Sequence, residues 1–333
     1  MSQSQFVSKC TVDSLQRAAN TLLAGNLVAF PTETVYGLGA DALNKQAVAR
    51  IYQVKGRPAD HPLIVHLYSM QVMGQWVDDV PEYAIELGRD FWPGPMTLIM
   101  KRSALAGDFV TGGQDTVGVR VPDHAVALGL LLSFAQIGGK GIAAPSANRF
   151  GNVSPTTAQA VADELSDYLA DVDQILDGGP CQVGVESTII DCTGDVPRIL
   201  RPGAVTSEMI NESTGLSLGV SKTAISAHVN QEEIRVSGSL ESHYAPMATV
   251  VLDRAPSSGE GFIAMAGVMA GNGVVRLAAP ESHQDFARVL YSALRAADEQ
   301  GLDIVVVEQP AGDGIAVAIR DRLMRAANSK RVH

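Results

Sequence analysis

The sequence predicts an α/β protein with a larger N-terminal domain and a smaller C-terminal one, and three observations support this interpretation. The chain has 333 residues, more than one hydrophobic core typically requires. Short apolar runs alternate with segments of helical periodicity in residues 1–205, and the alternation returns in residues 247–333. Residues 206–236 are rich in Ser, Thr, Asn, Glu and Gly with little periodicity, which is typical of a linker.

The first elements alternate between helix and strand. Thr11 can cap a helix over residues 12–23, where apolar residues recur at helical spacing. The apolar run Leu27–Phe30 predicts a buried strand, which the following proline ends. The polar residues Thr32–Thr34 and the glycines within Gly37–Gly39 then predict a turn in which a ligand can approach the main chain.

The rest of the N-terminal domain continues this pattern. Asn44 can cap a helix that ends at Lys55-Gly56-Arg57. Strands are predicted over residues 63–67, 96–100, 116–121, 142–144, 174–176, 187–190 and 198–200. In residues 116–121 the valines share one face, so Arg120 points away from them. Ser154-Pro155 has the N-cap and N1 arrangement of a helix start.

The C-terminal region reads as a second α/β unit. Strands are predicted over residues 248–252, 261–265 and 304–307, and helices over 285–300 and 315–327. Between the two domains, Ser237–Pro246 carries His243 and Tyr244, which a plain spacer does not need. We therefore interpret residues 206–246 as a linker that also serves as a lid.

Composition excludes several classes of protein. The net charge of −11 argues against a stable nucleic-acid binder. Three widely spaced cysteines indicate neither a disulfide framework nor a cysteine zinc site. No apolar run is long enough to span a bilayer, and the N-terminus has no apolar signal segment, so we expect a soluble, cytoplasmic protein with no membrane partner.

Four cations lie at the end or on the exposed face of a predicted core element: Lys55, Arg57, Arg120 and Arg201. Collected in an acidic domain, they indicate a small anionic ligand. Neutral donors beside them, namely Ser146, Asn148, Ser154 and the free N–H groups of the helix expected after Ser154, make a plausible triphosphate cradle. The alternative is that each cation makes a surface ion pair, which is the more common situation for any one of them.

Other chemical signatures are missing from the sequence. His61 and His66 lack the spacing of a helical zinc pair, so no protein metal site is expected. There is no P-loop, dinucleotide fingerprint or nucleophile elbow. The residues alone thus leave nucleophilic catalysis without an agent.

Seven motifs occur in order: F-P-T-E-T-V-Y-G-L-G-A-D-A, K-G-R-P-x-x-H-P-L-I-V-H, W-P-G-P-M-T-L, V-G-V-R-V-P, A-P-S-A-N, S-T-I-I-D and I-L-R-P-G-A. Together they resemble the threonylcarbamoyl-AMP synthase family, the YrdC-like proteins, in its longer two-domain form. The resemblance implies a YrdC-like twisted sheet with flanking helices plus a smaller, Rossmann-like C-terminal α/β domain. It implies the reaction of L-threonine, bicarbonate and ATP to L-threonylcarbamoyl-AMP, pyrophosphate and water, which supplies N6-threonylcarbamoyladenosine in tRNA.

The resemblance also implies roles for individual residues. Threonine would be held by Thr34, His66, Arg120, Ala144 and Ser187. ATP would be held by Lys55, Arg57, His61, Thr116, Ser146, Asn148, Ser154, Arg201, His243 and Tyr244. Lys55 and Arg57 would act in catalysis, Mg²⁺ would accompany ATP, and the product would pass to a tRNA-modifying transferase complex.

Two other classes stay open. One is a module that binds double-stranded RNA, against which the acidic charge argues. The other is a carbamoyl-transfer maturation factor that carries a similar domain, but such chains resemble multi-domain proteins with C-x-x-C zinc pairs, and this sequence has none.

Overall fold

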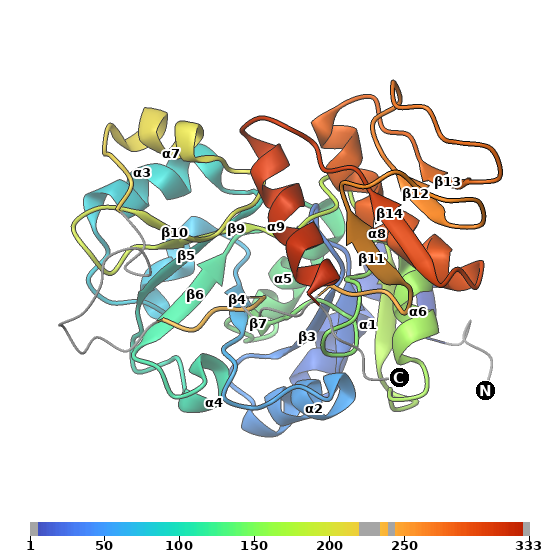
Figure 1. Ribbon diagram of the computed structural model, residues 1–333. Helices are drawn as coiled ribbons and strands as arrows, with labels where there is room; N and C mark the ends of the chain where they lie inside the picture. The colour runs from blue at the N-terminus through green and yellow to red at the C-terminus, as the bar shows by residue number, and fades with distance from the viewer. Residues whose placement is uncertain (1–5, 220–233, 239–243, 329–333) are drawn as a thin grey trace.

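The larger domain is built on one mixed sheet. The structure is a computed structural model that describes residues 6–219, 234–238 and 244–328 (Figure 1). The strands of this sheet are β1 (Val7–Lys9), β2 (Val28–Phe30), β3 (Gly37–Asp41), β4 (Ile64–His66), β5 (Met96–Lys101), β6 (Thr116–Arg120), β7 (Ile142–Ala143), β8 (Gln174–Asp177), β9 (Thr188–Asp191) and β10 (Arg198–Arg201). Their order is β1-β8-β2-β3-β7-β4-β6-β5-β9-β10, with parallel and antiparallel pairs.

Helices flank this sheet. They are α1 (Val12–Leu23), α2 (Lys45–Lys55), the 3-10 helix η2 (Met70–Gln75), α3 (Glu82–Phe91), α4 (Asp108–Thr111), α5 (Ala125–Gln136) and α6 (Ala158–Leu165). The expected caps are confirmed: Thr11 accepts from the backbone of the first turn of α1, and Asn44 does so for α2. Gly56 ends α2 in the left-handed conformation, as glycine does readily.

Both faces of the sheet are buried. In β2, Val28 and Phe30 join the cluster that packs on α1 and α5, while Ala29 joins the larger cluster on the opposite face. Successive side chains of a strand point to opposite faces, so a strand covered on both sides is apolar throughout. This explains why the run Leu27–Phe30 shows no polar alternation.

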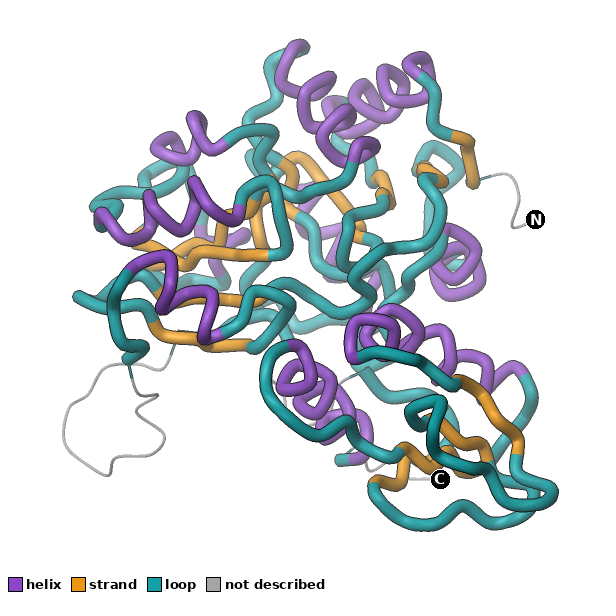
Figure 2. The backbone as a smooth tube through the Cα atoms, turned by 90° about the horizontal axis from the view of Figure 1, so that it is seen from above, coloured by secondary structure: helices purple, strands orange, loops and turns teal. Residues whose placement is uncertain are grey.

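The smaller domain has a parallel sheet of order β11-β14-β12-β13. Its elements are β11 (Thr249–Leu252), β12 (Gly261–Ile263), β13 (Val275–Ala278), α8 (His283–Glu299), β14 (Ile304–Val307) and α9 (Ile315–Ala327). Seen from above in Figure 2, the two helices lie between these strands and the larger domain. Helices α8 and α9 therefore form the docking face of the smaller domain.

The two domains share one apolar cluster. Val35, Val153 and Val185 of the larger domain pack with residues of α8 such as Phe286. Gly184 has a φ of +82°, and a Cβ atom there would lie 2.4 Å from the carbonyl oxygen of Ala287. Glycine is therefore required for α8 to approach this closely.

Three local predictions are wrong. Gly37–Gly39 belongs to β3, paired antiparallel with β2, and is not a turn, because its backbone completes the hairpin ladder. The helix expected to start at Ser154 is α6, which begins at Ala158 with Thr157 as its cap. The supposedly irregular stretch after residue 205 opens with helix α7 (Ser207–Thr214), capped by Thr206.

Within the part of the chain that the structure describes, no helix is both long and apolar enough to cross a bilayer.

Candidate active site

One pocket collects most of the predicted site residues. It lies where β2, β4, β6, β7 and β10 end or turn and where Ser237, Gly238 and Tyr244 cover the sheet. The described residues that line it are Thr32, Thr34, Val35, Gly37, Arg57, Ile64, His66, Arg120, Ala144, Pro145, Ser146, Glu186, Ser187, Arg201, Ser237, Gly238 and Tyr244. Segments far apart in the sequence thus form a single polar cavity.

The turn after β2 is locked by its own side chains. Thr32 Oγ1 accepts from the N–H groups of Thr34 and Val35, both at 3.2 Å, and donates to the carbonyl of Val35 at 2.7 Å. Such local bonds replace the missing ladder and fix the turn. The Thr34 hydroxyl consequently has a defined position in the pocket wall.

Arg120 is buried beside this turn. Its Nη2 donates to Glu33 Oε1 at 2.6 Å and to Thr34 Oγ1 at 3.0 Å, and its Nε donates to the carbonyl of Gly94 at 3.4 Å. Glu33 was not among the predicted site residues, although a carboxylate in a polar turn after a buried strand is a visible signal. The ion pair orients the guanidinium, while none of the described residues accepts a bond from its Nη1.

His66 is buried next to Arg120. Burial, with a smaller contribution from the neighbouring Arg120, lowers the pKa of His66 to about 3. Its ring stands edge-on to Phe30, and its Nδ1 has no hydrogen-bond partner among the described residues. His66 is therefore a neutral side chain with one ring nitrogen available to a ligand.

Two arginines converge on Ser237. Arg57 Nη2 donates to Ser237 Oγ at 3.1 Å, and Arg201 Nη1 donates to the Ser237 carbonyl at 2.8 Å. Arg201 also holds the Ser187 carbonyl through Nε and Nη2. Burial lowers the pKa of Arg57 to about 10 and also lowers that of Arg201. This side of the pocket is a desolvated cationic corner suited to an anion.

Lys55 lies behind the pocket wall. Its ammonium is fully buried and donates to the carbonyls of Ser146 and Asn148, each at 2.5 Å. Burial, together with repulsion from Arg57, holds the pKa of Lys55 well below its usual value. In this structure Lys55 fastens the loop after β7, from which Ala144, Pro145 and Ser146 line the cavity.

All four cations were expected at ends or exposed faces of core elements, and that expectation of exposure is wrong. Lys55, Arg57, Arg120 and Arg201 are at most 8% exposed. Their partners come from distant segments, so neither a solvent-exposed position nor a surface ion pair describes them.

The remaining predicted residues fall into three groups. Ala144, Ser146, Ser187 and Tyr244 line the pocket. Asn148, Ser154, His61 and Thr116 lie outside its wall; Ser154 donates to Glu186, and Thr116 lines a neighbouring groove. His243 lies outside the described residues.

Several wall residues were not among the predicted site residues, and they include Glu186, which accepts hydrogen bonds from Ser154 and Tyr291, and Ser237, which donates to the carbonyl of Pro62. Among the described residues, no group of three or more His, Cys, Asp or Glu side chains is arranged to hold a metal ion.

Known proteins resemble this chain over most of its length. Residues 20–203 match a family model for Sua5, YciO and YrdC proteins described as "Telomere recombination", and residues 205–328 match "Threonylcarbamoyl-AMP synthase, C-terminal domain". The chain is 39% identical to the threonylcarbamoyl-AMP synthase of Pyrococcus abyssi, over 93% of each chain. It is 38% identical to that of Bacillus subtilis, over 95% of this chain and 93% of the relative.

A solved structure of P. abyssi Sua5 complexed with L-threonine superposes with a TM-score of 0.84 at 36% identity, over 96% of each chain. These matches place the chain among proteins that join a Sua5–YciO–YrdC domain to a Sua5 C-terminal domain. The chain belongs to the threonylcarbamoyl-AMP synthase family.

Proposed function

We propose that this protein is an L-threonylcarbamoyladenylate synthase, a nucleotidyltransferase that joins L-threonine, bicarbonate and ATP. The observation that carries the proposal is the pocket itself, in which Arg120, Thr34 and neutral His66 line the same cavity as the buried pair Arg57 and Arg201. One end is suited to a small zwitterion and the other to phosphates. Family membership and the threonine complex of a relative support the same reaction.

Threonine is assigned to the end of the pocket beside β4 and β6. Arg120 offers its Nη1 donor to the carboxylate, while Glu33 holds the rest of the guanidinium in place. Thr34 and Ser187 supply hydroxyls, the Ala144 backbone lies in the wall, and His66 Nδ1 can accept a bond from the substrate. The amino group would then point toward the cationic corner.

ATP is assigned to that cationic corner. Arg57 and Arg201 would contact phosphate oxygens, with Ser146 and Tyr244 in the adjoining wall. Lys55 and Asn148 would act by shaping the loop after β7. Ser154 would act by holding the wall residue Glu186, to which its hydroxyl donates. His61, Thr116 and His243 remain candidates for more distant contacts with the nucleotide.

The chemistry needs no enzyme nucleophile. The neutral amine of threonine attacks bicarbonate, and loss of water gives a carbamate. A carbamate oxygen then attacks the α-phosphorus of ATP, and the bond to pyrophosphate breaks. The protein holds the two reactants in line and offsets the charge that moves onto pyrophosphate, which are effects that positioned donors supply in a water-poor pocket.

Mg²⁺ is proposed to enter with ATP. Among the described residues of the pocket wall, the charged side chains are cations and one carboxylate, Glu186, both of whose oxygens already accept bonds from protein donors. This donor set fits an ion whose ligands are phosphate oxygens and water, with Arg57 and Arg201 holding the same phosphates. When bound, Mg²⁺ supplies further neutralisation of the triphosphate.

The segment Ser237–Pro246 is proposed to act as a lid. Ser237 and Tyr244 lie in the pocket wall, and Ser237 bonds to both arginines of the cationic corner. A mixed anhydride hydrolyses in open water, so a cover serves the reaction. We also propose that the reaction takes place in the cytoplasm and that the product passes to a tRNA-modifying transferase complex.

Mass spectrometry of the protein incubated with ATP, bicarbonate and threonine tests the function directly. Threonylcarbamoyl-AMP should accumulate with stoichiometric pyrophosphate, and its absence at saturating substrates would reject the proposal.

The threonine end has its own test. Arg120→Lys should weaken threonine affinity by roughly 1.5–3 kcal/mol, because an ammonium cannot bond Glu33 and a carboxylate with the same fork. Calorimetry with threonine measures this, and an affinity equal to that of the wild type removes the carboxylate role.

A further inference from the structure

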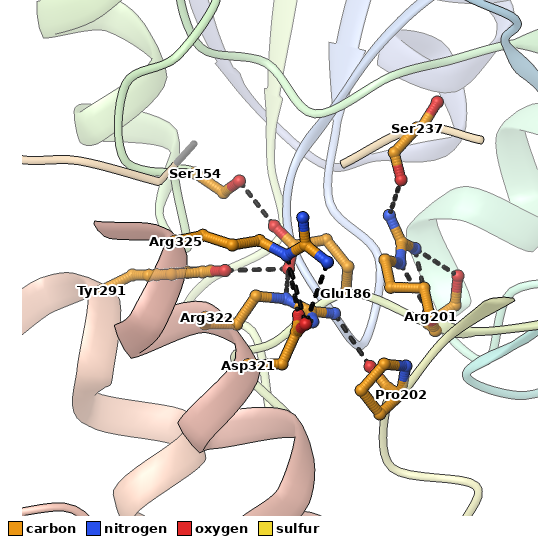
Figure 3. A network of polar contacts seen from close by, with 10 residues as sticks. Ser154, Glu186, Arg201, Pro202, Ser237, Tyr291, Asp321, Arg322 and Arg325 are labelled. Atoms are coloured by element: carbon orange, nitrogen blue, oxygen red, sulfur yellow. Dashed lines mark hydrogen bonds and ion pairs between the residues drawn. The ribbon is translucent and has the colours of Figure 1, made fainter. Parts of the chain in front are cut away.

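Glu186 is the point at which the smaller domain reaches the pocket. Its carboxylate is buried in the wall, and its Oε1 accepts from the Ser154 hydroxyl at 2.6 Å. Its Oε2 accepts from the Tyr291 hydroxyl and from Arg322 Nε, both at 2.8 Å (Figure 3). Tyr291 lies on α8 and Arg322 on α9, so two of these three donors come from the smaller domain.

Arg322 is held on every side. Its Nη1 donates to Asp321 at 2.5 Å and its Nη2 to the carbonyl of Pro202 at 3.0 Å. The guanidinium carbon lies 5.2 Å from the ring centre of Tyr244, which in turn stacks on Tyr291 at 5.8 Å. Arg322 therefore contacts two residues of the pocket wall, Glu186 and Tyr244, without lining the pocket itself.

A carboxylate has the wrong charge for a wall that receives a triphosphate. Burial alone would raise the pKa of Glu186, but Arg322 and then Arg201, helped by the bond from Ser154, lower this pKa to about 2. Glu186 thus stays ionised at neutral pH, and protonation does not remove its repulsion. A cation must do so, and among the residues that the structure describes, Arg322 is the cation in direct contact with it.

We propose that Arg322 is a positioning residue for the nucleotide: it neutralises Glu186 and steadies Tyr244, so that docking of the smaller domain completes the ATP end of the pocket. This inference rests on the proposed function, because it assigns the cationic corner to phosphates. It gives the smaller domain a specific electrostatic task in addition to its apolar packing against the larger domain.

Opposite charge changes at the two partners test the proposal. Arg322→Met should raise the KM for ATP at least about tenfold and leave the KM for threonine within about twofold, because the triphosphate is repelled by the carboxylate that Arg322 no longer neutralises, whereas threonine has no net charge. Glu186→Gln should leave the KM for ATP equal or lower, since it removes the negative charge. In the double variant, Glu186→Gln should bring the KM for ATP back to within about threefold of wild type.

A charge-free probe separates electrostatics from loss of shape. Calorimetry with ATP and with adenosine should show that Arg322→Met weakens ATP binding at least about tenfold but adenosine binding less than about twofold. Two matched variants accompany it. Tyr291→Phe removes a neutral donor to Glu186, and Arg295→Met removes the ion pair between α8 and Glu164, a domain contact outside the pocket. Both should change the ATP affinity by less than about threefold.

Several results would overturn the inference. They are an unchanged KM for ATP in Arg322→Met, equal losses for ATP and adenosine, no recovery in the double variant, or a loss in Arg295→Met as large as that in Arg322→Met. If Arg322→Met does not fold, a raised KM for ATP in Glu186→Gln alone still rejects it. If the wild type binds ATP but makes no adenylate, the proposed reaction is wrong while the two binding measurements still decide the role of Arg322.

Discussion

The two domains are both α/β units, but they bury polar groups in different places. The larger domain buries charged and polar side chains beneath and around the pocket, including Lys55, Arg57 and Arg120. Among the described residues of the smaller domain, Arg322 is the one charged side chain that is buried, and it faces the other domain. Buried charge is costly unless it is paired, so its location marks where each domain has a role beyond folding.

The sheets of the two domains also differ, in the direction of their strands and in the turns that interrupt them. The four strands of the smaller domain are all parallel. The larger sheet mixes both directions and is interrupted by polar turns after β2 and after β7, where the pocket lies. Binding groups therefore gather where the ladder stops, and the regular domain supplies the packing surface against them.

The first prediction tests whether the chemistry belongs to the larger domain. Arg57→Ala should lower kcat/KM for ATP by an amount that corresponds to about 2–4 kcal/mol of lost transition-state stabilisation. The reason is that it removes a desolvated donor to a phosphate whose charge changes in the transition state. Arg102→Ala removes an arginine of the same domain that pairs with Asp108 outside the pocket, and should have little effect. Steady-state kinetics distinguishes them, and equal kcat/KM values would remove Arg57 from the site.

Lys55 sharpens the same test. The family resemblance implies a catalytic role for Lys55, so its loss should lower activity, whereas the structure places its ammonium between the carbonyls of Ser146 and Asn148. Lys55→Ala should therefore also lower the free energy of unfolding by roughly 1–3 kcal/mol, because it leaves buried acceptors without a partner. Chemical denaturation measures this, and an unchanged midpoint would favour a direct role at the phosphate.

The pH dependence of stability tests the role of one buried group of the larger domain, His66. The pKa of His66 is about 3 in the folded protein, below its ordinary value of 6.5. Above pH 6.5 the His66 imidazole is neutral in both the folded and the unfolded protein. Below pH 6.5 it takes up a proton in the unfolded chain but not in the folded protein, so the free energy of unfolding falls as the pH drops toward 3. By about pH 4 this contributes roughly 3 kcal/mol of destabilisation.

His66→Gln should flatten that part of the stability curve, measured by denaturation at a series of pH values. His283→Gln, at the start of α8 in the smaller domain, removes an imidazole from outside the pocket and is the matched control. If both variants retain the full slope, another group causes the acid sensitivity.

A single methyl group added at Gly184 tests the contact between the larger domain and α8. Gly184→Ala places a methyl group against the backbone of α8, and overpacking of this kind costs about 1–3 kcal/mol. Gly179→Ala has the same φ of +82° with no atom within 4 Å, so it carries the backbone strain alone. Synthesis should fall more in Gly184→Ala than in Gly179→Ala, and equal rates would mean that close docking of α8 is not required.

The smallest effect concerns substrate choice. Serine lacks one methyl group of threonine, and a methyl group in a pocket is worth about 1–3 kcal/mol, so discrimination should be modest. Competition between the two amino acids, followed by mass spectrometry of the two adenylates, gives the ratio of kcat/KM values. A preference well above about 200-fold would show that the pocket recognises the hydroxyl geometry as well as the methyl group.

Local sequence patterns were enough to predict several of the helices and strands, and also the family. Helix α2 followed from Asn44 and Gly56, because caps and periodicity act between near neighbours. The ordered motifs around Thr34, Arg120 and Ser146 led to the threonylcarbamoyl-AMP synthase family, which the comparisons confirm. Both depend on residues that lie close together along the chain.

The tertiary structure decided which groups meet. Glu33 and Arg120 are 87 residues apart, and Glu186 and Arg322 are 136 apart, so no local pattern links them. Lys55 looked like a solvent-exposed cation because charge in a sequence usually predicts exposure, yet two carbonyls from a distant loop allow it to be buried. Burial of a charge depends on partners that only the folded chain brings together, and for that reason the sequence did not reveal it.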